Sequence, residues 1–342
     1  MIKRTIYFGN PAYLSTHNKQ LVVRLPEVEK CDSLSEVSKR KATATIPIED
    51  IGVVVLDHKQ ITISHGLINH LLANNCALIS CDDNHMPTGL ILPLDGNSIQ
   101  SERFYQQINM SLPLKKQLWQ QTIQAKISNQ RIVLQRYRKD VKIGNMRKWE
   151  CEVRSGDAMN LEARAAAYYW KNVFPSIPGF VRGRDEAPPN QLLNYGYAIL
   201  RAVIARALVG AGLLPTLGIH HHNRYNAYCL ADDIMEPYRP YIDEIVINMV
   251  DNNNYDTLST KHKQQFLQLP VKEVVINGKL KHSKPILHQL FTKLCIGFSL
   301  FFCVGRKIEE NKYPHHSVFA KTVHSSHGRG CNFPCFASNT LL

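Results

Sequence analysis

The stretch Ile51-Gly52-Val53-Val54-Val55-Leu56 decides how the first third of the chain folds. It is a short apolar run rich in β-branched residues, which is typical of a strand buried on both faces. Similar short runs, separated by turn-forming and polar residues, lie on both sides of it. A turn at 10–11 and a polar stretch at 15–19 are expected between strands, and Ser64 is placed to cap a helix over 65–74. The expected strands are 5–8, 20–24, 43–48, 51–56, 61–63, 77–80 and 88–92.

The pattern becomes helical after residue 101. Pro, Asp, Gly, Asn and Ser gather at 93–98, which is typical of a linker. Asp157 is expected to cap a helix over 158–172, and Gly210 and Gly212 are expected to end another over 191–208. We therefore predict a β-rich part at 1–97, a helical part at 98–314 and a poorly ordered tail at 315–342. The other predicted helices are 113–139, 226–236 and 242–250.

The charge of the chain indicates a polyanionic partner. The 342 residues are 44% hydrophobic and 20% charged, an ordinary globular composition, but 41 Lys and Arg face only 28 Asp and Glu, a net charge of +13. Such a surplus of positive charge favours nucleic acid or an anionic membrane surface as the binding partner. The longest apolar run, 294–304, is too short to span a bilayer, and charge near the N-terminus is not followed by the apolar segment of a signal peptide. We therefore expect a cytoplasmic protein without a membrane partner.

Most of the surplus charge falls in one window. Residues 113–149 hold ten Lys or Arg and a single acid, Asp140, for a net charge of +9. This concentration could mark a solvated helix face, but it favours a surface that contacts DNA phosphates. The residues predicted to bind DNA are Lys115, Lys126, Arg131, Arg136, Arg138, Lys139, Arg147 and Lys148, together with Arg164 on the next helix.

A few polar residues in the helical part could carry chemistry. Glu162 lies in a helix of Leu, Ala and Tyr, His220–His222 follow a Gly- and Pro-containing turn, and Asp233 and Glu236 are three residues apart on one predicted helix. Together a glutamate, one histidine and one of the two later acids form a ligand set that Mg²⁺ or Mn²⁺ accepts. The alternatives are a surface carboxylate at Glu162, a polar histidine loop, and Arg239 lying between Asp233 and Glu236. No phosphate-binding loop of the GxxxxGK[ST] type occurs in the sequence, so nucleotide-fuelled activity is not suggested.

Several long motifs resemble one known family. They are Gly212-Leu213-Leu214-Pro215-Thr216-Leu217-Gly218-Ile219-His220-His221-His222-Asn223-Arg224-Tyr225-Asn226-Ala227, its continuation over 230–240, and the segments 46–51, 156–169 and 189–197. In these stretches the chain resembles the "Cas one" family of CRISPR-associated adaptation integrases and endonucleases, in its type II form. The resemblance covers residues 1–314.

The resemblance implies a fold and a site. The fold is α+β, with an N-terminal β-rich, sandwich-like domain that dimerises and a C-terminal all-α catalytic domain. The site is a divalent metal, Mg²⁺ or Mn²⁺, held on the matching positions by Glu162, His221 and Glu236. Asp233 matches a further acid that supports the site. The motif alignment selects His221, and His220 is the alternative.

The resemblance also implies an activity and partners. The family inserts captured double-stranded DNA fragments into the CRISPR repeat array by metal-assisted transesterification, in which a 3′-hydroxyl attacks a phosphodiester. It acts as a homodimer within a heterohexamer containing the small "Cas two" protein, and in type II systems with the effector nuclease. The alternative functions are a structure-specific nuclease of branched DNA in repair and a non-catalytic basic scaffold that binds DNA. The tail 315–342 matches nothing in the family.

Overall fold

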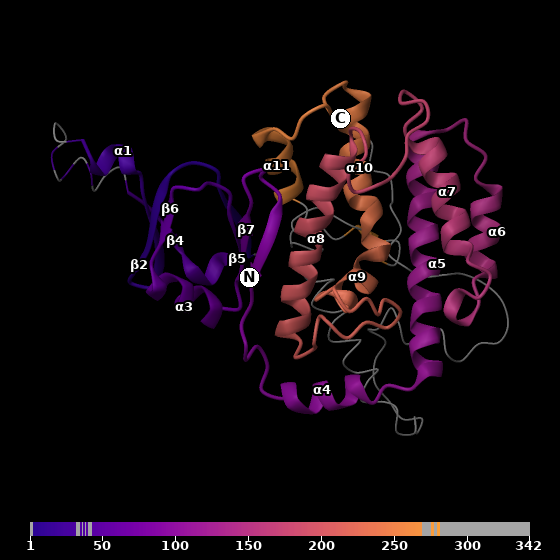
Figure 1. Cartoon of the computed structure of the whole chain (residues 1–342), viewed down its shortest axis with the longest axis horizontal. Coiled ribbons are helices and arrows are strands. Elements are labelled where there is room, and N and C mark those ends of the chain that lie inside the picture. The colour runs from indigo at the N-terminus through magenta and orange to yellow at the C-terminus, as the bar shows by residue number, and fades with distance from the viewer. Residues whose placement is uncertain are drawn as a thin grey trace.

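The computed structural model describes residues 3–31, 35, 37, 39, 43–268, 275–276 and 279–280 (Figure 1). The strands β1 to β8 lie together in the N-terminal part, and the helices from residue 100 onward form the larger part. This arrangement confirms the predicted α+β fold, with β-rich and helical parts in that order. The apolar run 294–304 and the tail 315–342 lie outside the described residues.

Two four-stranded sheets form the N-terminal part. The first has the order β1-β5-β7-β8, with β1, β5 and β7 parallel and β8 antiparallel. The second has the order β4-β3-β2-β6, in which only β2 and β6 are parallel. The strands of the first sheet are β1 (Arg4–Phe8), β5 (Ile51–Leu56), β7 (Ala77–Cys81) and β8 (Pro87–Ile91), and those of the second are β2 (Ala12–His17), β3 (Gln20–Arg24), β4 (Ala44–Pro47) and β6 (Ile61–Ile63).

Strand β5 contributes to two hydrophobic cores. Val54 packs in a cluster with Leu14 and Leu21 of the second sheet, whereas Val53 and Val55 belong to the core of the helical part. Neighbouring strand residues point to opposite faces, so a strand between two cores must be apolar throughout. Strands β7 and β8 of the same sheet contact α8 (Asn190–Gly210), and Figure 1 shows β7 on the side of the sheet that faces this helix. The core of the helical part therefore extends into the first sheet.

Helix α5 (Leu112–Tyr137) is the central element of the helical part. It packs on α7 (Leu161–Val173), α9 (Cys229–Met235), the 3₁₀ turn η3 (Glu236–Tyr238) and α10 (Arg239–Asp251). In Figure 1, α4 (Gln100–Ile108) crosses from the sheets to the start of α5. The remaining helices are α1 (Pro26–Glu29), α3 (His65–Ala73), α6 (Gly144–Glu152) and α11 (Thr260–Leu267), with short 3₁₀ turns η1 (Ile48–Asp50) and η2 (Ser155–Asp157), and β9 (Val275–Ile276) pairs with β10 (Lys279–Leu280).

Helix α8 is the single helix among the described residues that is long and apolar enough to cross a membrane. Its apolar window is 83% buried inside the fold, which identifies α8 as a core helix. It runs to Gly210, two residues beyond the predicted end, and Gly212 then takes the left-handed backbone (φ 70°) that a glycine adopts without strain.

Three predictions about individual elements were wrong. The polar stretch 15–19 is partly strand, because β2 pairs with both β3 and β6 while some of its residues stay accessible to water. The helix predicted from residue 158 begins at Leu161, since Asp157 and Asn160 both have positive φ. The helix predicted from 226 begins at Cys229, because the side chain of Asn226 accepts the N–H of Tyr228 and holds a turn. The cap predicted at Ser64 is confirmed, as its hydroxyl accepts the N–H of Leu67.

Candidate active site

Two glutamates far apart in the sequence meet at one lysine. The Nζ atom of Lys126, on α5, lies 2.6 Å from Oε1 of Glu162 on α7 and 2.6 Å from Oε2 of Glu236 in η3. The three side chains are only 12%, 25% and 5% exposed, respectively. The alternative interpretation of Glu162 as a surface carboxylate is therefore wrong: its side chain is largely covered and its partner comes from another helix.

Glu236 is also bound by an arginine. Arg239 Nε lies 2.8 Å from the second carboxylate oxygen, Oε1. Burial alone would raise the pKa of Glu236, but Arg239 and Lys126 outweigh it and hold the pKa at about 2. Glu236 is therefore ionised at neutral pH although it is buried.

Asp233 has a different set of partners, so the two acids do not share a cation. Its carboxylate accepts the backbone N–H groups of Ile219 (2.6 Å), His220 (2.9 Å) and His221 (3.2 Å). Its Oδ1 also lies 2.5 Å from Nδ1 of His221. A side chain at Gly218 would collide with this carboxylate and with the backbone of the turn, so a glycine is required there. Asp233 thus folds the histidine turn around itself.

The first two histidines have distinct environments. His221 is bound at Nδ1 by Asp233, and this hydrogen bond raises the pKa of His221 above its ordinary value. The His220 ring stacks on Trp119 of α5, with centroids 4.1 Å apart and 2° between the planes, and burial lowers the pKa of His220. The contact of Nδ1 with Asp233 leaves Nε2 of His221 as the nitrogen for a ligand, which favours His221 over His220 as the site histidine.

The side chains suit a metal in their chemistry, but they lie around a lysine. Two carboxylates and an imidazole are a donor set for Mg²⁺ or Mn²⁺. Within the part of the chain that the structure describes, no group of three His, Cys, Asp or Glu side chains lies in position to hold a metal ion. The two glutamates already converge on one cationic atom, and Glu236 lies near enough to His221 to raise its pKa. The donors therefore fit the ion, with Lys126 between them.

The predicted DNA-binding residues divide into two groups. Four of the nine are held in ion pairs with acids of the same chain: Lys126 as above, Arg131 with Glu150, Arg136 with Glu244 and Arg138 with Asp251. The sequence shows how many basic residues the window contains but not which acids pair with them, so it could not reveal these ion pairs. Lys115 is half-buried, and the exposed residues of the set are Lys139, Arg147, Lys148 and Arg164, of which Lys148 lies 3.9 Å from Glu152. The prediction that this set binds DNA stays a prediction, and the structure offers the exposed group for it.

Two residues that the sequence did not assign to the site help to form it. Trp119 supports the histidine turn through its stack with His220, and its only sequence signal is an aromatic at an inward position of a helix. Asp157 accepts the N–H groups of Leu161 and Glu162 and so fixes the start of the helix that carries Glu162. The sequence did suggest Asp157 as a helix cap, and these hydrogen bonds confirm that role, although the helix starts later than predicted.

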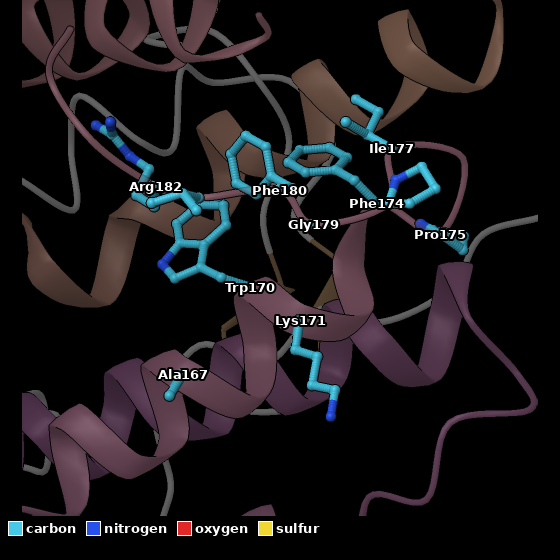
Figure 2. A pocket seen from close by; sticks show the side chains of 11 residues that line it. Ala167, Trp170, Lys171, Phe174, Pro175, Ile177, Gly179, Phe180 and Arg182 are labelled. Carbon is cyan, nitrogen blue, oxygen red and sulfur yellow. The ribbon is translucent and has the colours of Figure 1, made fainter. Parts of the chain in front are cut away.

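A separate cavity lies at the far end of α7 (Figure 2). Its volume is about 560 Å³, and the rings of Trp170, Phe174 and Phe180 gather on one side of it. In Figure 2 the side chain of Lys171 extends away from these rings. Arg182, at the edge, is bound to Asn190 and Asn194 and to the backbone. None of the acids or histidines of the candidate site lines this cavity.

Known proteins match this chain in sequence and in fold. A family model, "CRISPR associated protein Cas1", matches residues 6–277. The CRISPR-associated endonuclease Cas1 of Neisseria meningitidis serogroup C (strain 8013) is 34% identical over 267 residues, which are 78% of this chain and 82% of that protein. A second Cas1 endonuclease, from Pyrobaculum aerophilum, is 26% identical over 243 residues, 67% of this chain and 81% of that protein.

Solved structures share the fold at lower identity. A casposase bound to an integration product has a TM-score of 0.68 and 18% identity, covering 93% of this chain and 95% of that one. A Cas6-RT-Cas1–Cas2 complex has a TM-score of 0.67 and 21% identity over 88% of this chain and 35% of that one. A Cas1 protein from Thermotoga maritima has a TM-score of 0.65 and 14% identity over 91% of this chain and all of that one. The family model covers most of the chain, and the fold agrees with it; the chain belongs to the Cas1 family of CRISPR-associated proteins.

Proposed function

We propose that this Cas1 protein is a metal-dependent DNA integrase and endonuclease that inserts short DNA fragments into a CRISPR array. The 3′-oxygen of a fragment attacks a phosphodiester at the repeat boundary, one P–O bond forms, and the bond to the 3′-oxygen of the array strand breaks. The number of phosphodiester bonds is unchanged, so no nucleotide fuel is required, in agreement with the absence of a phosphate-binding loop from the sequence. Relatives named as endonucleases and a casposase bound to its integration product support this proposal.

The observation that carries the proposal is the convergence of Glu162 and Glu236 on one cationic position, with His221 close enough for the charge of Glu236 to raise its pKa. We assign Glu162, Glu236 and His221 as the residues that would hold Mg²⁺ or Mn²⁺. When bound, such an ion supplies positive charge that stabilises the phosphate and the leaving oxygen. Asp233 orients His221 by binding Nδ1, and Arg239 fixes Glu236 through its other oxygen. These contacts preorganise the donors, which lowers the cost of placing them at the reacting phosphate.

We also propose the partners of the reaction. Double-stranded fragments and repeat DNA would bind along the exposed basic residues of α6 and α7 and of the segment that follows α5. A Cas2 protein would join a homodimer of this chain in a heterohexamer, as the Cas1–Cas2 complexes among the structural neighbours suggest. The type II effector nuclease is a further proposed partner, in the choice of fragments.

An integration assay tests the function. Purified protein with Cas2, a fragment bearing free 3′-hydroxyls and a supercoiled repeat plasmid should give insertion with Mg²⁺ or Mn²⁺ and none with EDTA. Glu162→Gln should abolish insertion while DNA binding, measured by mobility shift, stays within about twofold. Insertion by Glu162→Gln at the wild-type rate would exclude this catalytic site and leave the scaffold function. Cleavage of branched DNA without insertion would favour the alternative of a structure-specific nuclease.

A further inference from the structure

We propose that Lys126 and the metal ion are alternative occupants of the same two carboxylates. The ammonium group of Lys126 holds Glu162 and Glu236 together, and metal binding would require it to leave. This inference rests on the proposed metal-dependent function, but it concerns the exchange of one cation for another. It assigns Lys126 as a positioning residue and not as a DNA ligand.

The geometry places Lys126 where a cation bound by these acids would lie. One nitrogen atom is 2.6 Å from an oxygen of each carboxylate, and the carboxylates come from two different elements, α7 and η3. Both elements pack on α5, which carries Lys126. A single positive atom shared by two acids from separate elements has the arrangement of a bridging ion.

Charge balance gives the reason for exchange. Lys126 and Arg239 together neutralise Glu162 and Glu236, so the cluster has no net charge. A divalent ion added beside Lys126 would leave these four side chains and the ion with a net charge of +2 in a largely buried place, which is unfavourable. Removal of the monovalent Lys126 reduces that excess, whereas Arg239 can keep its contact with the other oxygen of Glu236. Lys126 is thus the cation that the metal replaces.

Lys126 can release the acids by moving its side chain, because its Nζ is held by two ion pairs that come from two separate elements. Lysine has a flexible stem of four carbons, which permits such a movement, whereas the planar fork of arginine would not release two acids so readily.

The exchange explains two observations together. The two glutamates converge on one cationic atom, Nζ of Lys126, whereas no group of three metal-binding side chains is assembled among the described residues. Lys126 occupies the middle of the site and keeps it folded. Metal affinity is consequently reduced by the free energy needed to break the two ion pairs of Lys126.

Metal binding by Lys126→Met tests the exchange. Methionine has a similar length and no charge, so it removes the competing cation with little change of shape. We expect Mn²⁺, measured by calorimetry without DNA, to bind Lys126→Met at least tenfold more tightly than the wild type, and Lys126→Arg no more tightly than the wild type. We also expect a lower melting temperature for Lys126→Met without metal, and a larger rise on addition of Mn²⁺, because Glu162 and Glu236 then lose the ammonium group that they share.

Lys263→Met is the matched control. Lys263 is the other buried lysine of an ion pair in the described structure, 2.5 Å from Asp57, at the contact between the sheets and α11. Its replacement should lower stability without changing the affinity for Mn²⁺. An increase in affinity in both variants would indicate a general effect of charge and would overturn the exchange.

The outcomes separate this inference from the proposed function. If the wild type binds Mn²⁺ and Lys126→Met binds it no more tightly, the exchange is wrong and the metal-dependent function stands. If neither the wild type nor any of the variants binds Mn²⁺, the metal-dependent function fails and the exchange fails with it. If Lys126→Met does not fold, amine labelling of the wild type read by mass spectrometry decides. Labelling of Lys126 that rises with Mn²⁺ supports the exchange, and unchanged labelling overturns it.

Discussion

Trp119 and His220 lie face to face, with ring centroids 4.1 Å apart and planes within 2° of each other. Trp119 is 2% exposed and lies on α5, so the stack attaches the histidine turn to the central helix. The following residue, His221, is then bound by Asp233 through Nδ1. One histidine thus supports the turn while its neighbour faces the acids.

This division of roles predicts different effects of two alanine substitutions. His221→Ala should lower the integration rate by at least about 100-fold, because it removes a proposed metal ligand. His220→Ala should lower it by less than tenfold and should reduce the free energy of unfolding by about 1 kcal/mol, the typical value of an aromatic stack. Integration kinetics and thermal unfolding measure the two effects. If His220→Ala proved the more damaging to activity at unchanged stability, the assignment of the histidines would be reversed.

Asp233 should be sensitive even to the loss of its charge. Asp233→Asn replaces an oxygen that accepts backbone N–H groups with an amide that donates, so at least one buried N–H loses its acceptor. We expect a loss of about 2–3 kcal/mol in the free energy of unfolding and at least a tenfold slower integration. Asp232→Asn is the control, since the neighbouring acid binds Arg201 and Asn226 instead of the histidine turn. An equal loss of activity in both variants would contradict a specific role for Asp233.

The sequence allowed much of the fold to be predicted, but not the contacts between distant segments. The buried strand at 51–56 and the helix at 191–208 are visible because apolar spacing records which face is buried. The partner of Glu162 is 36 residues away along the chain, and no local pattern links the two. Lys126 consequently counted as part of a basic surface until the structure placed it between two acids.

The sequence likewise does not show which positive charges of residues 113–149 are paired with acids, and the difference between paired and exposed charges leads to a prediction. Alanine at exposed Arg147 or Arg164 should weaken DNA binding and reduce the slope of log affinity against log salt by up to about 0.9 for each phosphate that the protein no longer neutralises. Alanine at Arg131 should instead destabilise the protein by about 3 kcal/mol, because it leaves the buried Glu150 unpaired. Fluorescence anisotropy over a range of salt concentrations, together with chemical unfolding, measures both quantities.

A double comparison makes the charge prediction specific. The exposed variants are Lys139→Ala, Lys148→Ala and the alanine variants of Arg147 and Arg164. Arg138→Ala instead breaks the ion pair with Asp251. The exposed variants should change affinity at constant stability, and Arg138→Ala should lower stability. A salt slope that is unchanged by all the exposed substitutions would show that DNA binds elsewhere.

Asp243 should make stability depend on pH. It is buried in the helical core, where burial outweighs the hydrogen bonds from Tyr197 and Tyr169 and raises its pKa from 3.8 to about 6. The folded state then holds a proton that the unfolded state releases, so the contribution of Asp243 to stability is full below about pH 4 and is lost as the pH rises through 6. The loss corresponds to about 2–3 kcal/mol. In Asp243→Asn this group no longer titrates, and the free energy of unfolding of the wild type minus that of the variant should fall by this amount between pH 4 and pH 7.

Tyr169→Phe removes a hydrogen-bond donor to the carboxylate of Asp243 and should move the midpoint of that fall to higher pH. A difference that stays flat across this range in urea unfolding would show that Asp243 is ionised in the folded protein at pH 4.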